Sequence, residues 1–194
     1  MVAGPGRRSP EDVMTAPVVP ADPVAWPVAV ALRAAVADEL VAALGGTPAT
    51  TAVVPGRDVA IDDCCNGQAW VRIVRVFPTR PGEFPQGRTT PIGDGCDPGV
   101  YWAVELGVGT ARCAPSQDDF GNPPPAEDLE RSATVLADDA GRIRRAVLSR
   151  LPEVETVEEV FVGEQTSVGP SGGCVGQELL VTVMTTLCVG GDEE

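Results

Sequence analysis

Apolar residues recur every four positions over residues 23–44, and this spacing predicts an amphipathic helix. Asp22 precedes the helix as a capping residue, Pro23 suits its first turn, and Gly45-Gly46 is expected to end it. A second apolar repeat, with spacings of three and four, covers residues 129–151 and predicts a second helix. Each helix is expected to turn one face toward a common core.

Four segments between these helices have the β-branched or alternating pattern of strands, at residues 51–54, 58–61, 68–77 and 100–110. Asn66-Gly67 signals a tight turn into the third segment, and Pro78 is expected to end it. In the fourth segment Trp102 shares one face with alternating valine and leucine positions. We expect that face to meet the helices and Glu105 to point toward water or a neighbour.

Two further strands are expected at residues 155–162 and 178–187, joined as an antiparallel hairpin by a long Gly/Ser-rich loop. The resulting order, α-β-β-β-β-α-β-β, predicts an α+β fold in which an antiparallel or mixed sheet is packed by two helices. The predicted core residues are Leu32, Val36, Leu40, Trp102, Val104, Leu106, Leu136 and Ile143.

The length of 194 residues fits a single domain with tails. Residues 1–22 are rich in Pro and Gly without periodicity, and we expect a disordered N-terminal arm. Residues 23–189 would form the domain, and 190–194 an acidic tail. Residues 78–98 read as a long polar loop, and loops of this length are usually functional.

Charge and composition exclude several classes of function. The formal net charge is −14, all 14 basic residues are arginine, and there is no histidine. Without histidine the chain has no Ser-His-Asp or Cys-His catalytic group and no His-based zinc site, so we expect no catalytic residues and no cofactor. The acidity argues against sequence-independent binding of nucleic acid.

Membrane and targeting segments are not expected. No apolar run is long enough to predict a membrane span, and no apolar stretch follows Arg7-Arg8 to predict a Sec signal peptide.

Six cysteines are many for a cytosolic domain, and none has Cys-x-x-Cys spacing. Disulfides, buried free thiols and a scattered cysteine metal site are the competing interpretations. Adjacent Cys64 and Cys65 rarely bond each other, so we expect at least one of them to bond a cysteine of a different strand in the same subunit. The candidate disulfide residues are Cys64, Cys65, Cys96, Cys113, Cys174 and Cys188.

Other motifs have less specific patterns. The pairs Asp62-Asp63, Asp118-Asp119 and Asp138-Asp139 are sequence neighbours, and neighbours on a strand or helix point in different directions, so we expect no metal site. The glycine-rich segment 169–176 lacks the Gly-Lys-Ser/Thr ending of a phosphate loop and is followed by a strand, so a hairpin loop is expected.

Four segments together resemble the tail terminator, or an adjacent head-to-tail connector protein, of long-tailed actinobacteriophages. They are Asp62–Arg72, Tyr101–Val108, Arg112–Pro115 and Gly169–Cys174, and the resemblance covers about residues 24–190. It implies a tail-terminator-like sheet with two helices, and subunits that close into a six-membered ring capping the tail tube.

The resemblance also implies partners and a location. Each subunit would contact other copies of itself, the major tail tube protein and the head-tail connector or stopper, while DNA passes through the lumen without sequence-specific binding. The protein would assemble in the host cytoplasm and reside in the virion neck, away from membranes. A stopper or adaptor subunit is the nearest alternative.

Two rival classes come from the residues alone. A secreted, disulfide-bonded binding domain would explain the cysteines and the acidity, but no signal peptide is expected. An enzyme would have to use a lone cysteine or carboxylate, and no motif supports one.

Overall fold

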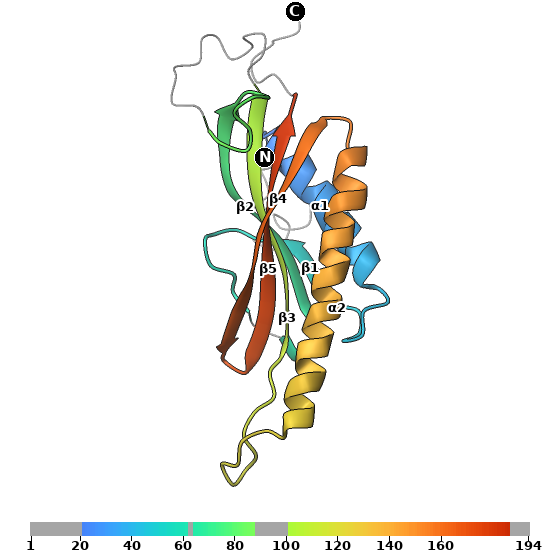
Figure 1. Cartoon of the computed structure of the whole chain (residues 1–194), viewed down its shortest axis with the longest axis vertical. Helices are drawn as coiled ribbons and strands as arrows, with labels where there is room; N and C mark the ends of the chain where they lie inside the picture. Colours follow the sequence, from blue (N-terminus) through green and yellow to red (C-terminus); the bar gives the residue numbers. More distant parts are fainter. Residues whose placement is uncertain (1–20, 62–63, 88–100, 187–194) are drawn as a thin grey trace, which may run out of the picture.

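A computed structural model describes residues 21–61, 64–87 and 101–186. Its two helices and five strands are drawn in Figure 1. The helices are α1 (Ala25–Leu40) and α2 (Ala126–Arg150), and the strands are β1 (Thr50–Val53), β2 (Gln68–Thr79), β3 (Tyr101–Cys113), β4 (Val157–Ser171) and β5 (Cys174–Thr185). Two short 3-10 helices, Cys64–Asn66 and Leu151–Glu153, lead into β2 and out of α2.

The five strands form one mixed sheet in the order β1-β2-β3-β5-β4. Only β1 and β2 run parallel, and the other three pairs are antiparallel. Both helices cover the same face, because side chains from α1 and α2 share a single apolar cluster with alternate residues of β2, β3 and β5. The predicted α+β class, a mixed sheet packed by two helices, is therefore confirmed.

The described residues contain one strand fewer than expected, in the order α-β-β-β-α-β-β. Residues 58–61 are not a strand. Val59 and Ile61 are instead partly buried against a small apolar cluster on the helix-free face, so the apolar pattern that suggested a strand reflects packing of an irregular segment.

Strand β2 continues through Pro78, which was expected to end it. Strand β1 pairs only with Gln68–Val71 of β2, so the rest of β2 is an edge of the sheet as far as residues 21–61, 64–87 and 101–186 are concerned. A proline is tolerated in an edge strand because its missing N–H costs no ladder hydrogen bond. The turn before β2 needs positive φ only at Gly67 (78°).

The expected cap of α1 is present, since Asp22 accepts hydrogen bonds from the backbone N–H groups of Val24 and Ala25. The helix nevertheless ends at Leu40, earlier than expected. Leu44 continues the four-residue spacing but lies beyond the helix and is 65% exposed, so its predicted place on the buried face is wrong.

Helix α2 has the expected period, but its first two apolar positions lie outside the core. Leu129 is 50% exposed and Ala133 is also exposed. The N-terminal part of α2 extends past the sheet (Figure 1), where no strand lies beneath it to bury these side chains. The apolar repeat predicts which face of a helix turns toward the core, but it does not predict how much of that face the sheet covers.

Most predicted core residues are buried. Leu32, Val36, Leu40, Val104, Leu106 and Ile143 are 0–2% exposed, and Leu136 is 8% exposed. Each fully buried leucine contributes roughly 1.5–3 kcal/mol through lost contact with water. Trp102 is only partly buried, packing against the edge of the core. The fully buried tryptophan is Trp70, on the opposite face of the sheet.

The predicted long loop between the last two strands is wrong. Strands β4 and β5 extend through it and meet at a two-residue turn of Gly172 and Gly173, both with positive φ. The glycines that suggested a loop allow close strand packing: a Cβ on Gly176 would lie 2.2 Å from the carbonyl oxygen of Thr110.

Several expectations lie outside the described residues. They concern the arm over residues 1–20, the loop over 88–98, the tail at 190–194, and Asp62, Asp63, Cys96, Val100 and Cys188.

Candidate functional site

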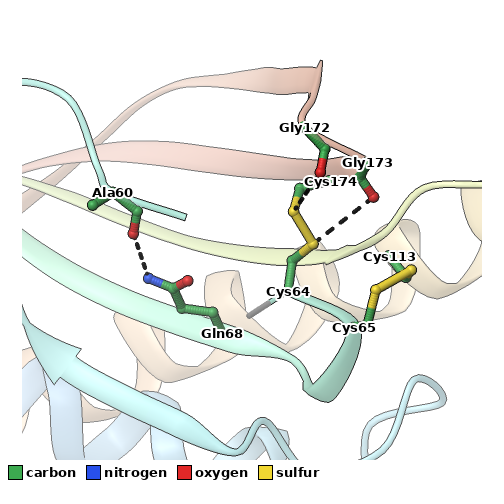
Figure 2. Close-up of a disulfide and its surroundings, with 8 residues drawn as sticks. All are labelled: Ala60, Cys64, Cys65, Gln68, Cys113, Gly172, Gly173 and Cys174. Atoms are coloured by element: carbon green, nitrogen blue, oxygen red, sulfur yellow. Dashed lines mark hydrogen bonds between the residues drawn. A yellow bond between two sulfur atoms is a disulfide. The ribbon is translucent and has the colours of Figure 1, made fainter. Parts of the chain in front are cut away.

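Two disulfides connect the 3-10 turn before β2 to the last residue of β3 and the first residue of β5 (Figure 2). Cys64 bonds Cys174 and Cys65 bonds Cys113, with Cα–Cα distances of 5.8 and 4.2 Å. Cys113 and Cys174 are themselves register partners between β3 and β5. The 3-10 turn at Cys64–Asn66 sends the two adjacent cysteines to different strands, so this short segment is held against both.

The expectation that Cys64 or Cys65 bonds a cysteine of another strand is therefore confirmed, and it holds for both residues. Within the described residues no cysteine is free. The sulfurs of Cys64 and Cys174 lie 3.8 and 3.9 Å from the carbonyl oxygens of Gly173 and Gly172. A disulfide sulfur carries no proton, so we treat these as packing contacts.

The Cys64–Cys174 bond belongs to the small apolar cluster on the helix-free face. Its other buried members are Trp70 and Ala111, and Val54, Val59 and Ile61 pack against them. Gln68 holds the covering segment in place, since its side-chain amide donates to the carbonyl oxygen of Ala60 at 2.8 Å. This disulfide is therefore part of a second core.

Beside this cluster, Glu178 of β5 accepts hydrogen bonds from Trp70 and Arg72 of β2. The indole Nε1 is 2.9 Å from Oε2, and the guanidinium donates through both Nε (2.8 Å) and Nη2 (2.5 Å). Both charged side chains are nearly buried, at 11% and 13% exposed. They lie over Gly107, where a Cβ would come within 3.1 Å of both.

These contacts shift both charged groups. Burial by itself raises the pKa of Glu178, but the hydrogen bonds from Arg72 and Trp70 outweigh it and bring the pKa below its ordinary value. The hydrogen bond to Glu178 raises the pKa of Arg72. Both groups therefore stay ionised near neutral pH, and the pair acts as a cross-strand tie.

A second buried ion pair joins the sheet to α2. Arg112 donates through Nε to Asp139 at 2.7 Å and through Nη2 at 3.0 Å, and its Nη1 donates to the carbonyl oxygen of Gly45 at 3.0 Å. A Cβ on Gly45 or Gly67 would lie 3.1 or 2.5 Å from the guanidinium. One arginine therefore connects β3, α2 and the segment after α1.

The neighbouring Asp138 faces another way, as expected for residues adjacent on a helix. It accepts hydrogen bonds from Arg142 and from the backbone N–H of Leu44, each at 2.8 Å. The Arg142 guanidinium lowers the pKa of Asp138. Arg142 also donates to the carbonyl oxygen of Glu39, so this pair fastens the C-terminal end of α1 to α2.

Asp118 uses its carboxylate within its own turn. It accepts from the backbone N–H of Phe120 and from both nitrogens of Asn122, and the Asn122 side chain lowers the pKa of Asp118. In the described part of the chain, no three His, Cys, Asp or Glu side chains cluster as metal ligands do.

A cleft of about 350 Å³ opens between the end of β3, the loop after it and the N-terminal half of α2. Arg112 and Arg131 line it, but each is paired with a carboxylate, Asp139 or Asp128. Its hydroxyls, Ser116 and Ser132, share the lining with Asp128, and no hydrogen bond joins either hydroxyl to a carboxylate of the described residues. The Arg112–Asp139 pair beside this cleft holds β3 against α2.

Sequence reasoning missed both buried ion pairs and the role of Trp70. Arg72 and Arg112 each stand between two apolar residues of a strand, and a charge at such a position is the one local signal that could have indicated a buried partner.

A scan against protein-family models gave no match, and a search of curated proteins gave none. No helix among residues 21–61, 64–87 and 101–186 has the length and apolar character needed to cross a membrane.

Proposed function

We propose that this chain is a structural subunit of a phage neck, a tail terminator whose copies form a ring that caps the tail tube, joins it to the head connector and lets DNA pass. The observation that carries this proposal is the architecture: both helices cover one face of a mixed sheet. Among the described residues, the other face is covered only around the small cluster of Trp70, and the outer side of β4 and most of β2 have no neighbouring strand.

The surface of the isolated subunit supports assembly. Several large apolar side chains are exposed over separate parts of the fold: Val41, Leu44, Phe120, Leu129, Leu148 and Phe161. Contacts between copies or with the neighbouring tube and connector would cover such residues. The net charge of −14 suits a conduit wall that repels DNA phosphates and lets the polymer slide.

The disulfides and buried ion pairs suit a subunit whose shape must resist mechanical force. Two disulfides and two buried ion pairs connect elements far apart in the sequence. Because phage assemble in a reducing cytoplasm and virions persist in an oxidising medium, we expect the disulfides to form after assembly.

Native mass spectrometry of the purified protein and reconstruction of intact particles test the proposal. We expect a closed oligomer of six copies, present in virions at the head-proximal end of the tail. A protein that is monomeric at all concentrations and absent from purified virions would overturn it.

The disulfides also favour a second candidate, a secreted disulfide-bonded binding domain. Extracellular domains commonly rely on such bonds. The location of the protein decides between the two: recovery from purified particles supports the neck subunit, and recovery only from the medium of uninfected cells supports the secreted domain.

A further inference from the structure

The two long edges of the sheet have no described strand beside them at the same end of the sheet. Strand β4 is the outer strand on one side. On the other side β1 pairs only with Gln68–Val71, with one more bond from Val54 to Val71, so Arg72–Thr79 of β2 has no described partner strand there. Exposed strand edges are sites for pairing with another chain.

The registers place these two edges at the same level. Residues that are register partners across β2, β3, β5 and β4 form rows that cross the sheet. One row consists of Arg75, Glu105, Thr182 and Phe161. The next row on the same face consists of Phe77, Ala103, Met184 and Glu159. Both rows lie on the helix-free face, because Glu105 and Ala103 alternate with core residues of β3. Each row therefore ends on β2 at one edge and on β4 at the other.

The two edges have opposite charge. The β2 edge carries Arg75, whose side chain is 61% exposed and pairs with Glu105 of β3, and the turn after β2 holds both Arg80 and Glu83. The first half of β4 carries exposed Glu158, Glu159 and Glu164, which form no ion pair with any described residue. Both edges also expose apolar groups, Val74 and Val76 on β2 and Phe161 on β4.

The strand directions are also compatible. Strand β2 is antiparallel to β3, β3 to β5 and β5 to β4, so β2 and β4 run in opposite directions. If a second copy stands beside the first in the same orientation, its β2 edge meets the β4 edge as an antiparallel neighbour. Such a head-to-tail contact uses two different surfaces and closes into a ring when the rotation permits.

We propose that the β2 edge (Arg72–Thr79) of one copy docks on the β4 edge (Val157–Glu164) of the next copy, with Arg75 facing Glu159 directly or diagonally. This inference rests on the proposed ring and specifies its subunit contact. Pro78 and the bulge between Ile73 and Arg75 interrupt the β2 edge, so side-chain charge and apolar contacts dominate over a shared hydrogen-bond ladder.

Charge reversal tests the contact. In Arg75→Glu both edges become acidic, and in Glu159→Arg both become basic, so each variant alone should remain monomeric or need about tenfold or more higher concentration to assemble. In an equimolar mixture every contact of an alternating ring joins opposite charges. Native mass spectrometry should therefore show closed oligomers of even number with equal amounts of the two variants.

Two controls separate this contact from general damage. Arg131→Glu makes the same reversal at a 74% exposed arginine on α2, away from both edges, and should assemble as the parent does. Glu105→Gln removes the intramolecular partner of Arg75 and leaves both edges intact, so it should also assemble. If circular dichroism shows Arg75→Glu to be unfolded, Arg75→Gln replaces it and should weaken assembly and its dependence on salt.

The outcomes distinguish the contact from the ring. If the parent forms closed oligomers and both single reversals assemble equally well, the proposed contact is overturned and the ring stands. If the singles fail and the mixture does not restore assembly, the pairing of these edges is also overturned. A parent that never assembles overturns the ring and this contact together.

Discussion

Arg112 and Asp139 form a bidentate ion pair between β3 and α2, and both side chains are buried, at 8% and 0% exposed. The remaining guanidinium nitrogen Nη1 donates to the carbonyl oxygen of Gly45, so the cation on β3 has partners on α2 and on the segment after α1. A buried charge is tolerated when it is paired and hydrogen-bonded, and it becomes costly when one partner is removed.

Removing Asp139 should therefore destabilise the fold strongly. We expect Asp139→Ala to lower the free energy of unfolding by about 3–5 kcal/mol, because it leaves the Arg112 charge buried without its partner. Urea denaturation measures the change. Asp128→Ala, which breaks the exposed pair with Arg131, is the matched control and should cost about 0–1 kcal/mol. Equal effects of the two substitutions would contradict this account of the buried pair.

A methyl group at Gly109 should also be poorly tolerated. Its Cβ would lie 2.4 Å from both the carbonyl oxygen of Gln177 and Cζ2 of the buried Trp70. We expect Gly109→Ala to cost about 1–3 kcal/mol through overpacking, measured by thermal or urea unfolding. Gly141→Ala within α2 meets no atom within 4 Å and should instead stabilise by about 0.5–1 kcal/mol. A neutral Gly109→Ala would show that the sheet relaxes around Trp70.

Glu178 should make stability depend on acid pH. Its folded pKa lies below the ordinary value of 4.5, so the unfolded chain binds a proton at higher pH than the folded chain. The stabilisation is complete above the unfolded pKa and is lost as pH falls through the folded pKa. In urea titrations between pH 7 and 3, the stability difference between the parent and Glu178→Gln should shrink below about pH 4.5. If the stability difference between the parent and Glu178→Gln does not vary with pH, the role of the ionised Glu178–Arg72 pair is contradicted. Glu164→Gln, at an exposed glutamate, serves as the control and should show no such pH dependence.

The cysteine pairing can be tested with paired variants. Cleavage at Arg57 and Arg72 leaves Cys64 and Cys65 in one peptide, so mapping alone does not separate the two bonds. The double variant Cys65→Ser with Cys113→Ser removes one bond and should keep the Cys64–Cys174 bond. Removing both cysteines of either bond should lower the free energy of unfolding by roughly 2–5 kcal/mol. The crossed variant, Cys64→Ser with Cys113→Ser, should expose two additional thiols to alkylation. No additional thiols in the crossed variant would rule out the pairing.

Graded reduction provides a further measurement on the parent. Cys65 and Cys113 are exposed, whereas Cys64 and Cys174 are 3% and 6% exposed. We therefore expect the Cys65–Cys113 bond to be reduced and alkylated first, because a reductant reaches it without opening the fold. Simultaneous loss of both bonds would contradict this difference in access.

Local periodicity was enough to predict both helices, the alternation of β3 and the Asp22 cap. These features depend on residues within a few positions of one another. The face of a helix or strand is set by its own repeat of 3.6 or 2 residues, and the cap by a side chain two or three positions from the N–H groups it accepts. The α+β class followed from the order of the elements.

Local patterns predicted less well where burial depends on distant segments. Leu44 and Leu129 continue a helical repeat but are exposed, because one lies past the helix end and the other past the sheet. Pro78 remains in a strand only because β1 is too short to pair beside it. The glycines at 163 and 176 extend the hairpin because neighbouring strands approach closely there.

The amino-acid sequence by itself determined the type of each long element and predicted that at least one of Cys64 and Cys65 would bond a cysteine of a different strand. Only the tertiary structure decided their partners, the burial of Trp70 in place of Trp102, and the pairing of Arg112 with Asp139. These contacts join residues 27 to 110 positions apart. Their formation depends on the spatial order β1-β2-β3-β5-β4, which places β5 between β3 and β4 and which no short-range repeat encodes.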